Sequence, residues 1–177
     1  MGEHRSTPQR TVAAIRRTLA GAPAQVAEGF AHAVRNAPKE RLDQVMRSPA
    51  RRVLLETIFW QMPRHIDPRA ARTMNCTIRW RITGKGDNEA DVYDLEFIDG
   101  RCRVIRGPGV APPKLTITVD GAEFLRLATG NSDPVKAYFT GRVALAGDVM
   151  VAAKASGLFR IPGVARRPIS TQPETSS

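Results

Sequence analysis

The segments TIRWRIT (residues 77–83) and VYDLEFIDGRCRVIR (residues 92–106) decide the fold. In the first, apolar side chains occupy every second position, which is the period of a strand with one buried face. The second repeats this alternation on both sides of Asp99-Gly100, the sequence signature of a type I′ hairpin turn. We therefore expect three consecutive antiparallel strands over residues 77–83, 92–98 and 101–106.

The polar positions of these strands carry opposite charges. Asp94 and Glu96 occupy the middle strand, and arginines occupy its two neighbours. Opposite charges that face each other across a sheet contribute about 0.2 to 1 kcal/mol per pair, so we expect them to pair on the exposed face. The arginines in question are Arg79, Arg81, Arg101 and Arg103.

Helices are predicted upstream of the strands. Apolar side chains recur at helical spacing, and the Asn36–Pro38 and Ser48-Pro49 segments mark the breaks between helices. Ser48 is expected to cap the third helix, with Pro49 in its first turn. The expected helices span residues 24–37, 39–47 and 49–62.

Strands and helices mix downstream of a Gly/Pro loop at residues 107–113. Residues 115–119 alternate as a fourth strand, and Asp120 with Glu123 forms a capping box for the next helix. A short helix from Asp133 to Phe139, a fifth strand over 141–147 and a last helix over 149–159 complete the prediction. The fold class is thus α+β: a five-stranded, mostly antiparallel sheet, covered on one face by helices and preceded by a helical extension.

Length and composition favour one domain. The chain has 177 residues, of which 42% are hydrophobic and 25% charged, values typical of a soluble globular protein. Residues 1–22 and 166–177 are polar and are expected to be disordered, leaving a single domain over 23–165. The arginines at 16 and 17 precede no unbroken apolar run, so we expect no export signal and a cytoplasmic location.

The net charge is +10, and residues 1–72 hold 13 basic against 6 acidic residues. This part carries no nucleic-acid-binding motif, so nucleic acid is an unfavoured partner. The basic side chains are either a solvated surface or a docking face for anionic membranes. The arginines considered for such a face are Arg47, Arg51, Arg52 and Arg64.

The sequence contains no recognisable catalytic constellation, metal site or cofactor motif. His4, His32 and His65 all lie upstream of the strands, and Cys76 and Cys102 are expected to pack as small apolar side chains. We therefore expect neither enzymatic activity nor a cofactor.

The apolar face of the predicted sheet carries bulky side chains, whereas the last helix begins VMVAAKA (residues 149–155), with small and flexible ones. Such a combination suits a ligand cavity as well as a packed core, and periodicity does not separate the two. The residues expected to line the cavity are Trp80, Ile82, Leu95, Phe97, Leu115, Ile117, Phe124, Leu127, Phe139, Leu145, Val151, Ala152, Ala155, Leu158 and Phe159.

Five motifs occur in a characteristic order: RWRI (79–82), YDLEFIDG (93–100), KLTITV (114–119), DGAEFLRLATG (120–130) and AYFTGRVALAGD (137–148). Together, over about residues 40–162, they resemble the sterol carrier protein type 2 domain. The resemblance implies a sheet covered by helices, with a tunnel that holds a sterol, fatty acid, acyl-CoA or other apolar molecule and no metal. Two alternatives stay open: an enzyme or biosynthetic accessory that presents an apolar substrate, and an interaction module with a filled core.

Overall fold

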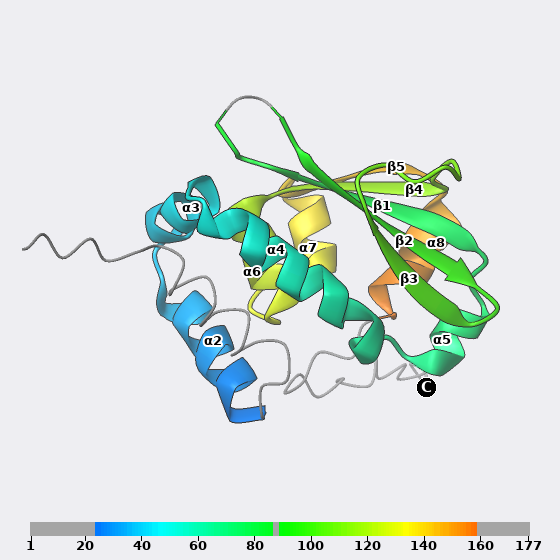
Figure 1. Cartoon of the computed structure of the whole chain (residues 1–177), viewed down its shortest axis with the longest axis horizontal. Helices are drawn as coiled ribbons and strands as arrows, with labels where there is room; N and C mark the ends of the chain where they lie inside the picture. The colour runs from blue at the N-terminus through cyan, green and yellow to red at the C-terminus, as the bar shows by residue number, and fades with distance from the viewer. Residues whose placement is uncertain (1–23, 87–88, 159–177) are drawn as a thin grey trace, which may run out of the picture.

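The computed structural model describes residues 24–86 and 89–158 (Figure 1). It contains a five-stranded sheet in the order β3-β2-β1-β4-β5, with helices over one face. The predicted α+β class is confirmed. The predicted leader and tail lie outside the described residues. The strands are β1 (Cys76–Thr83), β2 (Asp91–Ile98), β3 (Arg101–Arg106), β4 (Leu115–Asp120) and β5 (Val143–Gly147).

The first three strands form the predicted antiparallel meander. Asp99 and Gly100 have φ angles of 50° and 74°, as a type I′ turn requires, and Ile98 pairs with Arg101 beside them. β4 pairs with β1 in parallel and with β5 in antiparallel orientation. The sheet is therefore mixed, and its one parallel pair requires the chain to cross from β3 over β2 and β1 to reach β4.

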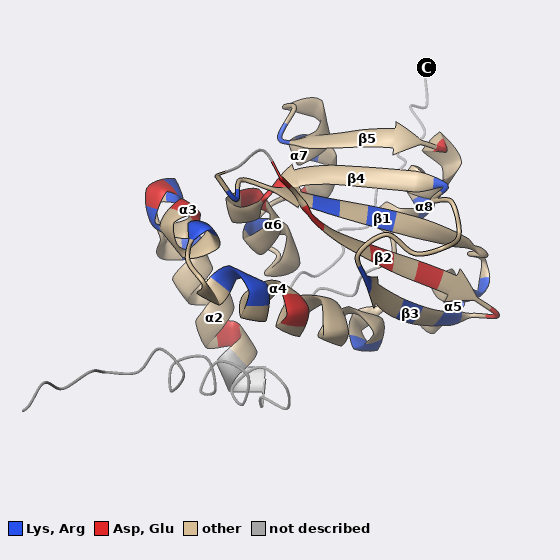
Figure 2. Cartoon of the chain, turned by 45° about the horizontal axis from the view of Figure 1, so that its top comes forward, with Lys and Arg blue, Asp and Glu red and all other residues tan. Residues whose placement is uncertain are grey.

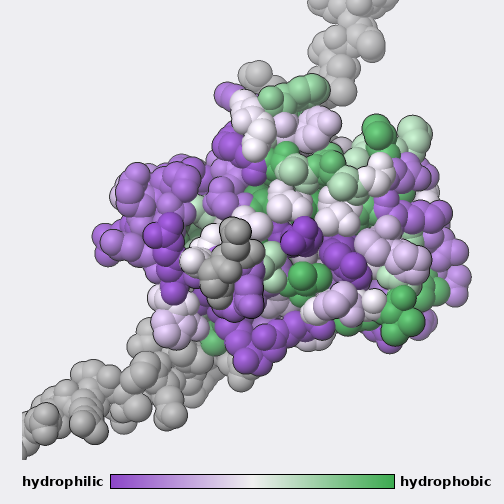
Figure 3. Space-filling model, turned by 90° about the horizontal axis from the view of Figure 1, so that it is seen from above, coloured by the Kyte–Doolittle hydropathy of each residue, from purple (hydrophilic) through white to green (hydrophobic). Residues whose placement is uncertain are grey.

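The connection between β3 and β4, residues 107–114, makes this crossing on the face of the sheet away from the helices. The backbone N–H of Gly109 donates to Oδ2 of Asp94 at 2.7 Å, and that of Lys114 donates to the carbonyl of Thr77 at 2.9 Å. Because the loop covers this face, Asp94 is fully buried. Figure 3 shows this outer face of the sheet, where hydrophilic side chains lie near the centre beside apolar ones.

The predicted charge pairs form under and beside this loop. Arg79 binds both carboxylate oxygens of Asp94 at 2.8 Å, and Arg103 binds Glu96 at 2.7 Å. The pairing prediction is confirmed for Arg79 and Arg103, whereas Arg81 and Arg101 lie opposite Val92 and Ile98. The face is not simply exposed, because the crossing loop shields the two carboxylates.

The helices follow the predicted order. Two short elements between the third helix and β1 were not predicted, and the third helix begins one residue late, with Pro49 rather than Ser48 at its N-cap. The helical elements are α2 (Ala24–Asn36), α3 (Lys39–Arg47), α4 (Ala50–Gln61), the 3-10 helix η1 (Met62–His65), α5 (Pro68–Arg72), α6 (Gly121–Ala128), α7 (Pro134–Phe139) and α8 (Val149–Ser156).

Asn131, which follows α6, joins α2 to the rest of the domain through two hydrogen bonds. Its amide donates to the carbonyl of Ala31 at 2.7 Å and its oxygen accepts from Nε of Arg35 at 3.0 Å. The helical extension is thus bonded to the C-terminal half of the chain.

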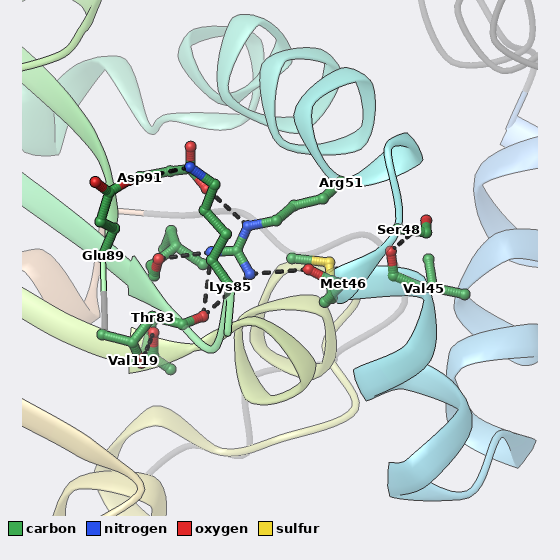
Figure 4. Close-up of polar contacts among 10 residues, drawn as sticks. Val45, Met46, Ser48, Arg51, Thr83, Lys85, Glu89, Asp91 and Val119 are labelled. Atoms are coloured by element: carbon green, nitrogen blue, oxygen red, sulfur yellow. Dashed lines mark hydrogen bonds and ion pairs between the residues drawn. The ribbon is translucent and has the colours of Figure 1, made fainter. Parts of the chain in front are cut away.

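Arg51 of α4 joins the helical layer to the sheet (Figure 4). Its guanidinium donates to the carbonyls of Ile82 (2.6 Å) and Thr83 (3.1 Å) at the end of β1 and to that of Met46 (3.0 Å) in α3. Its Nε also binds Asp91 at 2.7 Å. Arg51 is only 4% exposed, so the expectation that it belongs to a basic docking face is wrong. The buried guanidinium is stabilised there because its donors are matched by backbone carbonyls and by the Asp91 carboxylate.

Replacing Arg51 by methionine should lower the free energy of unfolding by about 3 to 5 kcal/mol. The apolar side chain fills similar space but leaves Asp91 and the carbonyls without their donors. Urea unfolding measures the change. The control is Arg52→Met on the same helix, because the Arg52 side chain is 66% exposed and pairs with Glu56, and its loss should cost less than about 0.5 kcal/mol. Equal losses in the two variants would contradict a special role for Arg51.

Candidate functional site

A row of four side chains crosses the sheet beneath the helices. Trp80 of β1 lies directly opposite Tyr93 of β2 and Ile117 of β4, and Ile117 lies opposite Leu145 of β5. Because directly opposed residues share a face, all four point into the space between sheet and helices. We call them the central row.

Solvent exposure increases along the central row. Tyr93 is 1% exposed, Trp80 and Ile117 are each 8% exposed, and Leu145 is only partly buried. Within this row the interior is closed most tightly at β2 and least tightly at β5, whereas Leu115 and Val119, the other inward residues of β4, are only 1% and 2% exposed.

An aromatic cluster fills the tight half. The ring of Phe59, from α4, stacks on Tyr93 with centroids 4.0 Å apart and on Phe124 of α6 at 5.1 Å. Trp80 meets Phe59 and Phe124 edge-on. Such contacts stabilise beyond the area they bury. Phe59 was missed as a site residue because its helical spacing assigns it to a buried face without indicating which strand it meets.

Small side chains face the other half. Ala137 of α7 and Val151 and Ala155 of α8 are buried, and Ala152 packs against the core while partly exposed. Asp148 caps α8 by accepting from the backbone N–H groups of the next turn at 2.8 and 3.2 Å.

The structure brings most predicted lining residues together at the boundary between sheet and helices. Phe139 differs: it is 80% exposed, so the expectation that it packs against the sheet is wrong. Phe159 lies outside the described residues. Leu127, Leu145 and Ala152 are partly buried. The others are buried: Trp80, Ile82, Leu95, Phe97, Leu115, Ile117, Phe124, Val151, Ala155 and Leu158.

Glu123 has a different role from the one expected. Asp120 accepts from its backbone N–H at 3.0 Å, as a cap should, but the Glu123 carboxylate does not return to Asp120. It accepts instead from Ser132 and, at 2.8 Å, from Arg142, just before β5. Glu123 is 2% exposed, so this ion pair fixes the start of β5 to α6 from the inside.

A pocket of about 480 Å³, lined by both charged and apolar residues, lies at one end of the sheet, at the start of β2 and the end of β3. Its lining includes Lys85, Asp91 and Arg106, so it carries both charge signs. It is distinct from the apolar space predicted between sheet and α8.

Both cysteines are free and partly buried, and they flank Phe97 on the neighbouring strands. Burial raises the pKa of Cys76, and it raises the pKa of Cys102 to about 12. Within the described ranges, no three His, Cys, Asp or Glu side chains gather as metal ligands. No helix there has the length and hydropathy needed to cross a bilayer.

This arrangement can be compared with known proteins. The model of the SCP-2 sterol transfer family matches residues 55–160. The chain belongs to this family. The matched range contains every residue predicted to line the cavity, and it begins just after Arg51.

Individual relatives of this SCP-2 family member are distant. The peroxisomal multifunctional enzyme type 2 of Mus musculus is 31% identical over 80 residues, which is 45% of this chain but 11% of the mouse protein. The sterol carrier protein 2 like 2 of Aedes aegypti is 22% identical, covers 60% of this chain and 96% of its own, and has a TM-score of 0.49. The sec-alkylsulfatase Pisa1 of a Pseudomonas species is 19% identical, covers 59% of this chain and 16% of its own, and has a TM-score of 0.50. At this identity the likeness concerns the fold.

Cys102 should resist alkylation. With a pKa near 12, its thiolate population at pH 8 falls about a thousandfold below that of an ordinary thiol, and only the thiolate reacts. Iodoacetamide labelling followed by mass spectrometry should show slow modification in the folded protein and fast modification in urea. Rapid labelling of folded Cys102 at pH 8 would contradict its assignment as a packing residue.

Proposed function

We propose that this SCP-2 family member binds an apolar, lipid-like molecule between the sheet and helices α6, α7 and α8, and carries it without chemical change. The observation that supports this most directly is the rising exposure along the central row. Trp80 and Ile117 are each 8% exposed and Leu145 is only partly buried, whereas Leu95 and Phe97 are fully buried, so solvent comes closer to the interior at the centre of β4 and β5 than at β2.

The proposed site is the half of the interior under β4 and β5. The aromatic cluster of Phe59, Tyr93 and Phe124 bounds it on one side, and the small side chains of α8 bound it on the other. Binding is driven by removing apolar surface from water, at about 25 cal/mol per Å². A sterol, a fatty acid or an acyl chain each fits this chemistry, and the ligand's polar end is expected at the mouth.

The second proposal concerns docking to anionic membranes. Arg47, Arg52 and Arg64 are exposed on α3, α4 and η1, and Arg51 is removed from this set by its burial. Basic residues near an anionic bilayer contribute about 1 kcal/mol each. We propose this surface as a transient docking face.

Ala152→Trp should abolish ligand binding with little change in stability. The indole would occupy the proposed ligand space, whereas in a filled core the same overpacking costs about 1 to 3 kcal/mol. A fluorescent fatty acid reports binding, and thermal unfolding reports stability.

The matched control is Ala153→Trp, because Ala153 is the exposed neighbour on α8 and should leave both measurements unchanged. If Ala152→Trp unfolds the protein and the parent chain binds no fatty acid, the proposed cavity is rejected in favour of an interaction module. Chemical conversion of the bound molecule, seen by native mass spectrometry, would instead indicate the enzyme or accessory alternative.

Docking to membranes is tested with vesicles. The parent protein should co-sediment more strongly with vesicles containing phosphatidylserine than with pure phosphatidylcholine, and Arg47→Glu with Arg64→Glu should reduce the difference several-fold. Added salt should weaken the binding as well, because exposed charges are screened. Equal binding to both lipids would contradict a basic docking face.

A further inference from the structure

The two edges of the sheet differ in how they are protected. β3 carries arginine at positions 101, 103 and 106, and charged side chains of this kind prevent an edge strand from pairing with another chain. β5, with the sequence VALAG, carries no charge at all (Figure 2). Among the described residues it pairs with β4 alone, so its outer edge offers a row of backbone donors and acceptors.

Exposed apolar side chains stand at both ends of β5. Phe139, at the end of α7, is 80% exposed, and Val149 and Met150, at the start of α8, are 78% and 68% exposed. Large apolar side chains gathered around an uncharged edge strand mark an interaction surface.

The sequence of this edge is complementary to itself. When two copies of β5 run antiparallel with all five residues paired, Leu145 faces its own counterpart, Val143 faces Gly147, and Ala144 faces Ala146. One step beyond the strand, Arg142 of one copy, which within its own chain bonds Thr140 and Glu123, lies opposite Asp148 of the other, whose Oδ1 caps α8. The register also brings Phe139 of one copy towards Val149 and Met150 of the second. Charge, side-chain size and apolar surface therefore match in a single register.

We propose that the protein forms a two-fold symmetric dimer through antiparallel pairing of β5 with β5, producing one continuous sheet across both copies. The partner that pairs with the free edge of β5 is thus a second copy of this chain. A two-fold axis perpendicular to the sheet is the symmetry that gives such an isologous contact. It also leaves the helices of both copies on the same face of the joined sheet.

The full-length protein tests this by sedimentation velocity between 1 and 100 µM, concentrations on the order of those at which such contacts are measured. A mass of twice 19.4 kDa that dissociates on dilution is expected. A monomer throughout this range would overturn the proposal.

Two double variants test the register. Ala144→Lys with Ala146→Lys places like charges opposite each other and should weaken dimerisation at least tenfold. Ala144→Lys with Ala146→Glu places a lysine opposite a glutamate at both 144–146 contacts between the copies and should retain the dimer. Both alanines are exposed, so circular dichroism should show both variants folded. If the two variants weaken the dimer equally, or if neither does, the proposed register is wrong.

The apolar contact is tested separately. Phe139→Ser should weaken the dimer, whereas Trp60→Ser, which alters a 55% exposed aromatic on α4, should leave it unchanged. If the parent is monomeric and Phe139→Ser instead reduces binding to neutral vesicles, the surface is a membrane contact and the dimer is rejected.

Discussion

One buried guanidinium joins the helical layer of this protein to its sheet. Arg51 leaves α4, passes between α3 and the sheet, and ends on the carbonyls of Ile82 and Thr83 and on Asp91. Only arginine has enough donors in a fixed planar arrangement to serve this many acceptors at once. These bonds tie the start of α4 to the end of β1, and two turns further along the same helix Phe59 stacks on Tyr93 and Phe124. The aromatic cluster, and hence one wall of the proposed ligand site, depends on this anchor.

The interior divides into a rigid part and an adaptable part. Stacked aromatic rings and complete burial of Leu95 and Phe97 make the half under β2 resistant to change, as close-packed cores are. The half under β4 and β5 is covered by the alanines and valines of α7 and α8, and these small side chains leave more room for a ligand. Glu123 and Arg142 lie between these parts, and their ion pair fixes where β5 begins. If β5 also joins two copies, the ligand sites of both would open on one side of the assembly.

The sequence was sufficient to predict the parts of this fold that depend on local patterns. Alternation identified the strands, Asp99-Gly100 identified their hairpin, and five ordered motifs identified the family. Contacts made across the fold were not predictable in this way. Arg51 has the sequence pattern of an exposed helix residue, because its acceptors lie on β1, on β2 and at the end of α3, and the sequence does not show that these elements meet there. Glu123 matched a local capping box, yet its carboxylate found Arg142 through the tertiary structure. Phe139 was expected to line the cavity, but it lies at the end of α7, near the edge strand β5, and is 80% exposed among the described residues.

The loop over the outer face of the sheet has a consequence for how the chain assembles. β1, β2 and β3 are consecutive in the chain, with residues 84–90 between the first two and the Asp99-Gly100 turn between the second and third, so their pairing closes only short loops. β4 must find β1 across the whole meander, after residues 107–114 have crossed it, and this longer closure costs more chain entropy. We therefore expect β4, β5 and the helices that follow to join last during folding. Segments that join last often open first, as cooperative units below the global unfolding free energy. Such partial opening would give a bulky guest a route in and out while the meander stays folded.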